Sequence, residues 1–393
     1  MTGTYLTLNA GSSSIKFAIF GSDDGTENPV LKGKIAGIGS APVFSAQDAE
    51  NMPIDSAAMA HIDASLDHED LLARLLSWLR AYQGDQPLVG VGHRVVHGGK
   101  KYSGPALISQ AVLAELEALI PLAPLHQPHN IAAIRAVAQW DPHLPQIACF
   151  DTSFHRTQDH LAQLFALPQA FTAEGVIRYG FHGLSYDYIA SVLPKYFADK
   201  PSSRVIVAHL GNGSSMCAMK NRQSMATSMG FTALDGLMMG QRCGTLDAGV
   251  VLYLMQTKGM SAPEIENLLY KQSGLLGVSG LSNDMRVLQD RDTPEAREAI
   301  ELYCYRAAAH LAGLVPAIGG LDALIFTAGI GENSALVRHL ICDRLAWLGI
   351  ELDETANKQN AVTISTDSAR VTTCVIPTNE EATIAAACQQ AFS

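Results

Sequence analysis

Positive charge is scarce in this sequence and is nowhere clustered. Its 393 residues include 27 Lys and Arg against 38 Asp and Glu, which gives a net charge of −11. Binding to nucleic acid depends on runs or patches of Lys and Arg that neutralise phosphates. No basic run occurs, so nucleic acid is not expected as a partner. If the substrates are anions, the few cations must be concentrated in one cleft.

Long apolar runs and paired cysteines are missing as well. No run of about 18 uninterrupted apolar residues occurs, so we expect no membrane span. The first residues, MTGTYLTLNAGSSS, contain neither a basic segment nor an apolar stretch, so we expect no secretory signal. Seven cysteines lie apart without a CxxC pair, which is typical of reduced thiols in a cytoplasmic protein and not of a disulfide framework.

Apolar residues make up 48% of the chain, which is enough to fill buried cores, and the length suits two domains. Short β-like runs alternate with amphipathic helical patterns, which predicts an α/β fold. The expected strands are residues 5–8, 15–20, 88–92, 146–150, 205–210, 323–327 and 371–376. Helices are expected to start after four residues that favour N-terminal caps: Asp67, Ser261, Thr293 and Thr378.

Two segments in different halves of the chain resemble each other. Residues 8–17, LNAGSSSIKF, and 209–218, HLGNGSSMCA, both place a turn of Gly, Ser and Asn between short apolar runs, and each predicts a hairpin. Small residues at such a tip expose backbone N–H groups to an anion. The repeat indicates either two related halves that face one cleft or two ordinary glycine hairpins. The boundary between the halves is expected near residues 149–152.

A third glycine-containing segment, residues 325–333, predicts a strand, a glycine turn and then a helix. The free N–H groups and the positive dipole end at the start of a helix suit phosphate. Neither GxGxxG nor GxxxxGK followed by Ser or Thr occurs, so the sequence gives no support to a Rossmann or P-loop nucleotide site.

Side chains that suit phosphoryl chemistry follow the predicted strands and turns, where sites usually form. They are Lys16, Arg94, Asp151, His182 and Arg242. Each has an ordinary alternative, because a lone arginine is most often a surface or salt-bridge residue, a lone histidine is most often structural, and Asp151 could cap the next segment. Their joint position beside three glycine segments is stronger evidence for a nucleotide site than any one of them, and it leaves these alternatives open.

Ordered motifs make the sequence resemble the acetate kinase family over nearly its whole length. They are LNAGSSSIKF (8–17), GHRVVHGG (92–99), PLAPLHQPHN (121–130), FDTSFH (150–155), RYGFHG (178–183), HLGNGSS (209–215), MGQRCG (239–244), FTAGIGENS (326–334) and PTNEE (377–381). The resemblance implies an α/β fold of two ribonuclease-H-like domains, the duplicated actin-like ATPase fold, with an active-site cleft between them. An N-terminal domain would span 1–150, joined by the C-terminal segment at about 376–393. A nucleotide-binding domain would span 151–375.

The resemblance also implies roles for individual residues. The catalytic residues would be Asp151, Arg94, Arg242 and His182. Arg94 would bind the substrate carboxylate, and the pocket for its alkyl group would be lined by Val96, Leu125, Phe181 and Ala233. Asn9 and Glu380 would serve a Mg²⁺ or Mn²⁺ site. The residues around ATP or ADP would be Ser12, Ser14, Lys16, His209, Leu210, Gly211, Asn212, Gly213, Asp284, Met285, Arg286, Gly329, Ile330, Gly331, Glu332 and Asn333.

The implied reaction is reversible, direct in-line transfer of a phosphoryl group from ATP to acetate, carried out by a homodimer. A carboxylate is already ionised at neutral pH, so it needs cations rather than a general base. In a sugar kinase Asp151 would instead be the base, because an alcohol must lose its proton. Two other functions stay open: a propionate kinase, and an ATP-driven conformational switch of the Hsp70 and actin kind.

Three positions depart from the family's pattern. Tyr186 stands where many members have a second histidine, Ala233 stands where a pocket-lining proline is common, and residues 244–248, GTLDA, replace a more usual GD(I/L)DP. Replacing proline by alanine removes ring atoms, and one methylene in an apolar pocket discriminates between substrates by about 1–3 kcal/mol. We therefore expect propionate to be accepted.

Overall fold

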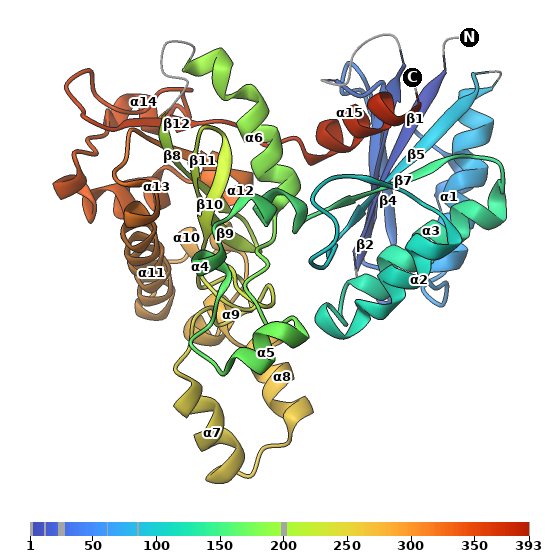
Figure 1. Cartoon of the computed structure of the whole chain (residues 1–393). Helices are drawn as coiled ribbons and strands as arrows, with labels where there is room; N and C mark the ends of the chain where they lie inside the picture. The colour runs from blue at the N-terminus through green and yellow to red at the C-terminus, as the bar shows by residue number, and fades with distance from the viewer. Residues whose placement is uncertain are drawn as a thin grey trace. The chain divides into compact units, whose positions relative to one another are not determined.

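The structure is a computed structural model that describes residues 3–11, 13–22, 28–60, 62–84, 86–197 and 203–392 (Figure 1). The chain forms two compact units, each built on its own sheet. Unit 1 comprises Met1–Phe154, Gly183–Tyr188 and Asn379–Ser393. Unit 2 comprises His155–His182 and Ile189–Thr378.

The sheet of unit 1 has seven strands in the order β4-β3-β2-β1-β5-β7-β6. Neighbours from β4 to β1 are antiparallel, β1, β5 and β7 are parallel, and β6 is antiparallel to β7. The bounds are β1 (Thr4–Ala10), β2 (Ser14–Gly21), β3 (Leu31–Ala36), β4 (Val43–Asp48), β5 (Leu88–Val95), β6 (Ala106–Leu107) and β7 (Gln146–Phe150). The four strands expected in this part of the sequence are all confirmed.

Both faces of this sheet are covered, because side chains alternate along each strand. Leu6 and Leu8 of β1 pack with the apolar side of α1, whereas Tyr5 packs on the opposite face with Ile384 of α15. The helices are α1 (His68–Gln83), α2 (Gln110–Ala118), α3 (Gln127–Trp140) and α15 (Glu380–Phe392). Figure 1 shows the red helix α15 beside the blue strand β1, so the end of the chain returns to the sheet that its start forms.

The sheet of unit 2 repeats this topology. Its strands run in the order β10-β9-β8-β11-β12, with β8, β9 and β10 antiparallel and β8, β11 and β12 parallel. The bounds are β8 (Arg204–Leu210), β9 (Ser214–Lys220), β10 (Gln223–Thr227), β11 (Ala323–Thr327) and β12 (Thr372–Val375). Counted along unit 2, these are its third, second, first, fourth and fifth strands. Unit 1 shows the same order, β3-β2-β1-β5-β7, once its outermost strands β4 and β6 are left out. The expected α/β fold with two actin-like halves is confirmed.

The core of unit 2 packs around the long helix α11. The helices after the first sheet are α4 (His160–Gln163), α5 (Gln169–Glu174), α6 (Gly183–Tyr196), α7 (Ala248–Gln256), α8 (Ala262–Lys271), α9 (Gly274–Ser279), α10 (Met285–Gln289), α11 (Pro294–Ile318), α12 (Ala328–Asn333), α13 (Ala335–Asp343) and α14 (Glu354–Lys358). Short 3₁₀ helices occur at Ala57–Met59, Ile120–Leu122, Ser153–Thr157 and Ala346–Leu348. Within the described part of the chain, no helix has the combination of length and apolar character that crossing a bilayer demands.

The three glycine segments form two hairpins and one junction between a strand and a helix. β1 pairs with β2 as far as Ala10 and Ile15, and β8 pairs with β9 as far as Leu210 and Ser214, so both predicted hairpins are confirmed. The third prediction is wrong in one respect. Helix α12 begins directly after β11, so the two glycines of this segment lie inside the helix and not in a turn before it. Ala328 makes the change of direction itself, with a φ of 63°.

Polar side chains cap the helices, with one correction to the sequence analysis. The Asp67 side chain accepts from the N–H groups of the first turn of α1, and Thr293 does the same for α11. Thr378 was expected to cap the last helix, but Asn379 does so, because its Oδ1 accepts from Ala382 N at 3.0 Å. The error is one residue, because Thr and Asn are both good caps and the sequence alone does not choose between neighbours.

Candidate functional site

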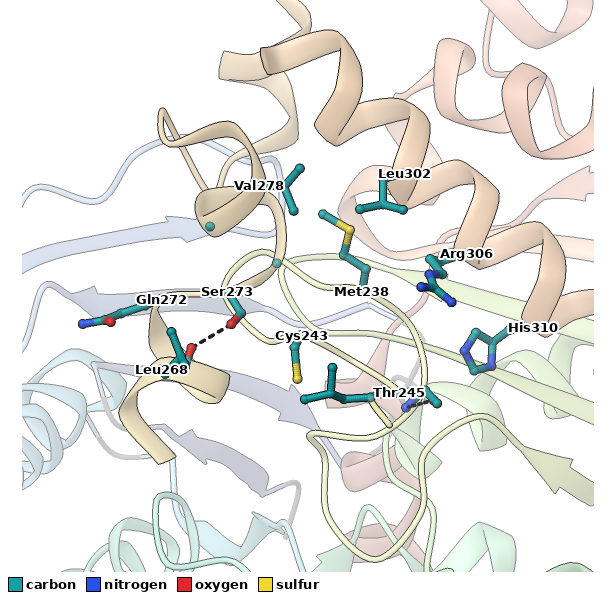
Figure 2. A pocket seen from close by; sticks show the side chains of 14 residues that line it. Met238, Cys243, Thr245, Leu268, Gln272, Ser273, Val278, Leu302, Arg306 and His310 are labelled. Carbon is teal, nitrogen blue, oxygen red and sulfur yellow. Dashed lines mark hydrogen bonds between the residues drawn. The ribbon is translucent and has the colours of Figure 1, made fainter. Parts of the chain in front are cut away.

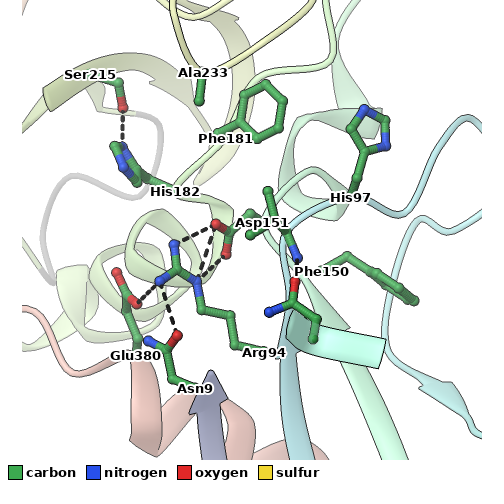
Figure 3. Close-up of polar contacts among 12 residues, drawn as sticks. Asn9, Arg94, His97, Phe150, Asp151, Phe181, His182, Ser215, Ala233 and Glu380 are labelled. Carbon is green, nitrogen blue, oxygen red and sulfur yellow. Dashed lines mark hydrogen bonds and ion pairs between the residues drawn. The ribbon is translucent and has the colours of Figure 1, made fainter. Parts of the chain in front are cut away.

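An arginine, two carboxylates and an amide meet in unit 1, where three parallel strands end (Figure 3). Arg94 lies near the carboxyl end of β5, Asp151 directly follows β7, and Asn9 lies near the end of β1. Glu380 is the first residue of α15. The carboxyl ends of neighbouring parallel strands meet at one edge of a sheet, which is where ligands of such sheets usually bind.

Arg94 and Asp151 form an ion pair in which both carboxylate oxygens take part. Arg94 Nη2 lies 2.6 Å from Asp151 Oδ2, and Arg94 Nε donates to the two oxygens at 3.0 and 3.2 Å. The contacts of Arg94 Nη1 are longer, with Asn9 Oδ1 at 3.4 Å and Glu380 Oε2 at 3.8 Å. Asp151 therefore fixes the plane of the Arg94 guanidinium. The Nη1 side of this guanidinium keeps hydrogen-bond donors for a ligand.

The charges in this cluster depend on one another. The side chain of Asp151 is 2% exposed and that of Arg94 is 21% exposed. Burial alone would lower the pKa of the Arg94 guanidinium, but Asp151 and Glu380 outweigh it and hold this pKa above its usual value. Burial raises the pKa of the Asp151 carboxyl, and Arg94 opposes that rise. Removing either partner would leave an uncompensated buried charge.

The oxygens of Asn9 and Glu380 fit a hard divalent cation. Mg²⁺ prefers oxygen ligands and is usually held by one or two carboxylates together with substrate phosphates and water. The described residues include no group of three or more His, Cys, Asp and Glu that could hold a metal ion. An amide and a carboxylate beside Arg94 suit a metal that arrives with a nucleotide better than one held by the protein alone.

Lys16 lies opposite Asn9 in the hairpin formed by β1 and β2. Residues paired across strands point to the same face of a sheet, so Lys16 adds an exposed positive charge on the face that carries Asn9. Ser14 begins β2 and is half-buried. Ser12, also predicted for this loop, lies outside the described residues.

In unit 2 an arginine and a histidine lie against the tip of the second hairpin. A side chain on Gly213 would place its first carbon 2.9 Å from Arg242 Nη2 and 3.3 Å from His182 Nε2, so both groups lie directly against this glycine. His182 Nδ1 is hydrogen-bonded to Ser215 Oγ at 2.8 Å (Figure 3). Arg242 Nη1 donates to the carbonyl of Ala233 at 2.6 Å. These contacts fix both side chains beside the exposed backbone of the tip.

The same hairpin tip is tied to the loop that carries Arg242. Gly240 N donates to Asn212 O at 3.0 Å, and Gly211 N donates to Gly213 O at 3.1 Å. His209, at the end of β8, is buried with its ring centroid 4.3 Å from that of His182. The structure therefore brings His182, His209 and Arg242 together around one turn.

The two polar side chains at the end of α12 bond to the protein itself. Glu332 Oε1 accepts from Ala328 N at 2.8 Å and from Thr378 N at 3.1 Å, so this carboxylate joins the start of α12 to the segment after β12. Asn333 Nδ2 donates to Gly329 O at 2.9 Å. Contacts from this helix to a phosphate must therefore come from backbone N–H groups and not from the Glu332 side chain.

The predicted adenosine contacts at the start of α10 differ in accessibility. Asp284 caps this helix and forms an ion pair with Arg286, whose side chain is 83% exposed. Met285 is instead buried in the core of unit 2. Its side chain supports the fold, and only its two neighbours present polar groups to the surface.

The predicted alkyl pocket has members in both units. Val96, just beyond β5, is buried, and Leu125, just before α3, is half-buried. Phe181 is buried in unit 2. The residue that holds the Phe181 backbone was not predicted from the sequence. His155 Nε2 bonds to Phe181 O and Nδ1 bonds to Ser224 Oγ, both at 2.9 Å. This histidine ends the FDTSFH motif, but its role depends on contacts distant in sequence.

A separate cavity in unit 2 has a volume of about 390 Å³ (Figure 2). Apolar side chains such as Met238 and Leu302 line it together with Arg306 and His310. None of the residues predicted for the site lines this cavity, although Cys243 on its wall is next to Arg242. The described structure therefore keeps this cavity distinct from the cluster around Gly213.

Sequence comparisons with known proteins point to one family. The sequence model of the Acetokinase family matches residues 4–386. An acetate kinase of Rhodopseudomonas palustris (strain ATCC BAA-98 / CGA009) is 50% identical over 390 residues, covering 98% of this chain and 97% of the relative. An acetate kinase of Methylocella silvestris is 49% identical over 392 residues, with 98% and 97% covered.

Solved structures of similar proteins extend over the whole chain. A propionate kinase from Francisella tularensis superposes with a TM-score of 0.91 at 38% identity, and 98% of each chain is covered. The acetate kinase of Porphyromonas gingivalis gives a TM-score of 0.88 at 32% identity, with 100% of each chain covered.

The buried His155 predicts a pH dependence of stability. Burial lowers its pKa to about 4, whereas an unfolded histidine titrates near 6.5. Between these values the unfolded chain binds a proton that the folded protein does not, so acidification from pH 6.5 to 4 favours unfolding. We predict that His155→Gln flattens the fall in unfolding free energy over this range by up to about 3 kcal/mol.

Urea unfolding followed by circular dichroism at several pH values measures this slope. His160→Gln, at an exposed position of the same unit, serves as the control and should keep the wild-type slope. A His155→Gln variant with the full wild-type pH dependence would show that this histidine does not stay neutral in the folded protein.

Proposed function

This chain belongs to the Acetokinase family, and we propose that it transfers the γ-phosphoryl group of ATP to acetate, giving acetyl phosphate and ADP reversibly. The protein is a kinase, and its family implies ATP as the co-substrate. The observation that carries the proposed chemistry is the Arg94 guanidinium, oriented by Asp151 at the ends of β5 and β7, with its Nη1 side toward Asn9 and Glu380.

This arrangement suits a substrate that is already an anion. Acetate needs no proton removed, but it must approach a polyanionic triphosphate. The donors that Asp151 leaves unused on Arg94 can hold a carboxylate oxygen, since a guanidinium has five N–H donors in a fixed plane. A carboxylate oxygen then forms a bond to the γ-phosphorus while the bond to the β-phosphate oxygen breaks. ADP leaves with that electron pair, and no proton is transferred.

Asp151 acts in this scheme as the group that orients Arg94. Both of its oxygens accept hydrogen bonds from the guanidinium, at 2.6 to 3.2 Å. A general base for an alcohol substrate would need an oxygen available to the hydroxyl proton. The ion pair therefore favours a carboxylate kinase over a sugar kinase.

Charge that develops on the transferring phosphoryl group requires further donors. Arg242 and His182 lie together at the hairpin tip of unit 2, and in this proposal they stabilise that charge. The backbone of His209–Gly213 and the start of α12 would contact the nucleotide phosphates, with Asp284 and Arg286 on the adenosine side. The two units correspond in this proposal to a substrate-side domain and a nucleotide-binding domain.

The oxygens of Asn9 and Glu380 are the proposed protein ligands of Mg²⁺. When bound, the ion would neutralise phosphate charge and polarise the γ-phosphoryl group. Asn9 is placed by β1 and Glu380 by the capped start of α15, so both ligands come from regular elements of unit 1. Regular elements hold such ligands more precisely than loops do.

Propionate kinase activity is the second candidate, and the residue at position 233 favours it. Alanine there leaves more room than the proline common in the family, and a solved propionate kinase is among the similar structures. Tyr186, by contrast, leaves the chemistry unaffected in this account. It is fully buried, with its ring 6.3 Å from that of Phe154, and so serves packing where other members have a histidine.

ADP release measured with acetate, propionate, butyrate and glycerol tests the proposal. We expect turnover that depends on acetate or propionate, and a loss of about 10³–10⁵ in kcat for Arg94→Ala and for Arg242→Ala. Arg135→Ala removes a guanidinium from an exposed ion pair with Glu117 and should keep wild-type kinetics. Equal ADP release without any carboxylate would contradict the kinase assignment and favour an ATP-driven switch. A preference for glycerol would restore Asp151 as a base.

We further propose a homodimer that forms through α7. No residue of this helix is buried, and its sequence AGVVLYLMQ has no charged side chain. The exposed side chains include Leu252, at 53%, and Tyr253, at 48%. A contiguous apolar face of this kind usually marks an interface, and an uncharged face can meet a second copy of itself without repulsion.

The dimer proposal predicts that Leu252→Glu gives a monomer, because a two-fold interface would bury the new charge twice. Sedimentation equilibrium of the variant and the wild type measures the state directly. Leu161→Glu changes another exposed leucine of unit 2 and should leave the dimer intact. Dimers of unchanged stability in Leu252→Glu would place the interface elsewhere.

A further inference from the structure

The strands β1 and β5 separate near their carboxyl ends. Their ladder ends with the pair Leu8 and His93, although β1 continues to Ala10 against β2 and β5 continues to Val95 against β7. Asn9 and Arg94 are the next residues on the two strands, so they lie where the ladder has just ended. Beyond this point the backbone groups of β1 and β5 no longer pair with each other in the ladder.

A buried side-chain amide from α3 fills the gap between the strands. Asn130 is 2% exposed; its Nδ2 donates to Ala10 O at 2.8 Å and its Oδ1 accepts from Val96 N at 3.0 Å. The Ala10 carbonyl can only accept and the Val96 N–H can only donate, so one orientation of the amide satisfies both groups. The side chain thus takes the place that a peptide group of a third strand would occupy.

A second amide of the same helix turn holds the next residue of the β5 segment. Gln127 is fully buried; its Oε1 accepts from His97 N at 3.2 Å and its Nε2 donates to His97 O at 3.1 Å. Residues three apart lie on the same face of a helix, so both amides point the same way from the first turns of α3. Together they join the chain after Arg94 to a rigid element, and Asn130 alone extends this link to β1.

We propose that Asn130 is a positioning residue for the phosphoryl transfer, an inference that rests on the proposed function. Its amide sets the separation between the end of β1, which carries Asn9, and the end of β5, which carries Arg94. These two side chains also touch directly, but only through the 3.4 Å contact of Arg94 Nη1 with Asn9 Oδ1. The two short hydrogen bonds of Asn130 therefore constrain the position of the Arg94 guanidinium relative to Asn9, the proposed metal ligand, more strongly than this contact does.

The alternative is that Asn130 contributes only to stability, as any buried and satisfied amide does. The two roles predict different kinetics. A purely structural residue changes the fraction of folded enzyme, which lowers kcat in proportion and leaves the KM for acetate unchanged. A positioning residue changes the site of the folded enzyme, and a misplacement of about 1 Å can reduce catalysis about 10²-fold.

The test compares Asn130→Ala with Val137→Ala. Val137 lies seven residues further along α3 on the same buried face, and its truncation destabilises unit 1 without touching the bonds to Ala10 and Val96. Kinetics are measured at a temperature where circular dichroism shows both variants folded. We expect kcat/KM for acetate to fall about 10²-fold in Asn130→Ala, with a raised KM for acetate, and to change less than about threefold in Val137→Ala. Equal kinetics in the two variants would overturn the proposal.

Hydrogen exchange followed by mass spectrometry supplies a readout that does not need activity. Peptides covering residues 9–16 and 92–99 should exchange faster in Asn130→Ala than in Val137→Ala, because only the first variant frees the Val96 N–H and the end of β1. The same exchange in both variants would overturn the bridge. If the wild type shows no carboxylate-dependent turnover, the proposed function fails, and the exchange comparison still decides whether Asn130 couples the two strand ends.

Discussion

The ion pair between Arg94 and Asp151 is the interaction on which the rest of this site depends. A chain with a net charge of −11 must bring two anions together, and it does so with very few cations. Without Asp151, the positive charge of Arg94 would be largely buried and uncompensated. If carboxylates paired with every side of the guanidinium, no N–H donor would remain for the substrate. Asp151 binds one side of the guanidinium and leaves the Nη1 side for a ligand. The same ion pair therefore compensates the buried charge and keeps donors for the substrate.

The fold supplies the place for this pair. Parallel strands deliver Arg94 and Asp151 to neighbouring carboxyl ends, and α15 brings Glu380 from the far end of the chain to the same cluster. The separation of β1 from β5 provides room for side chains between strand ends, and the Asn130 amide keeps that room from varying. Unit 2 uses the same sheet topology, but there a glycine hairpin tip, not a strand gap, accommodates Arg242 and His182.

Much of the fold could be predicted from the sequence, because the signals are local. Continuous apolar runs predicted β1, β2, β5, β7, β8, β11 and β12, and small residues between such runs predicted both hairpins. The strands β3, β4, β6 and β10 were not predicted. Two predictions failed at the level of single residues: the glycines of residues 325–333 are helical, and Asn379 caps α15. Neighbouring residues with similar propensities compete at such points, and tertiary contacts decide between them.

The residues of the site were predicted through family motifs more than through chemistry, and the supporting residues could not be found that way. Asn130 lies 120 residues from Ala10 and 34 from Val96 in sequence, so no local pattern indicates its two hydrogen bonds. His155 is a similar case, since its partners lie 26 and 69 residues away. Such buried polar groups stand out only when their partners are known in space.

The central claim is that the planar guanidinium of Arg94, oriented by Asp151, holds the substrate carboxylate. Steady-state kinetics of Arg94→Lys test it most directly, because lysine keeps the charge but loses the fork. We predict that the KM for acetate rises about tenfold or more, as expected for a lost charge-assisted hydrogen bond worth about 1.5–3 kcal/mol, while the KM for ATP changes little. An unchanged KM for acetate with a raised KM for ATP would contradict it.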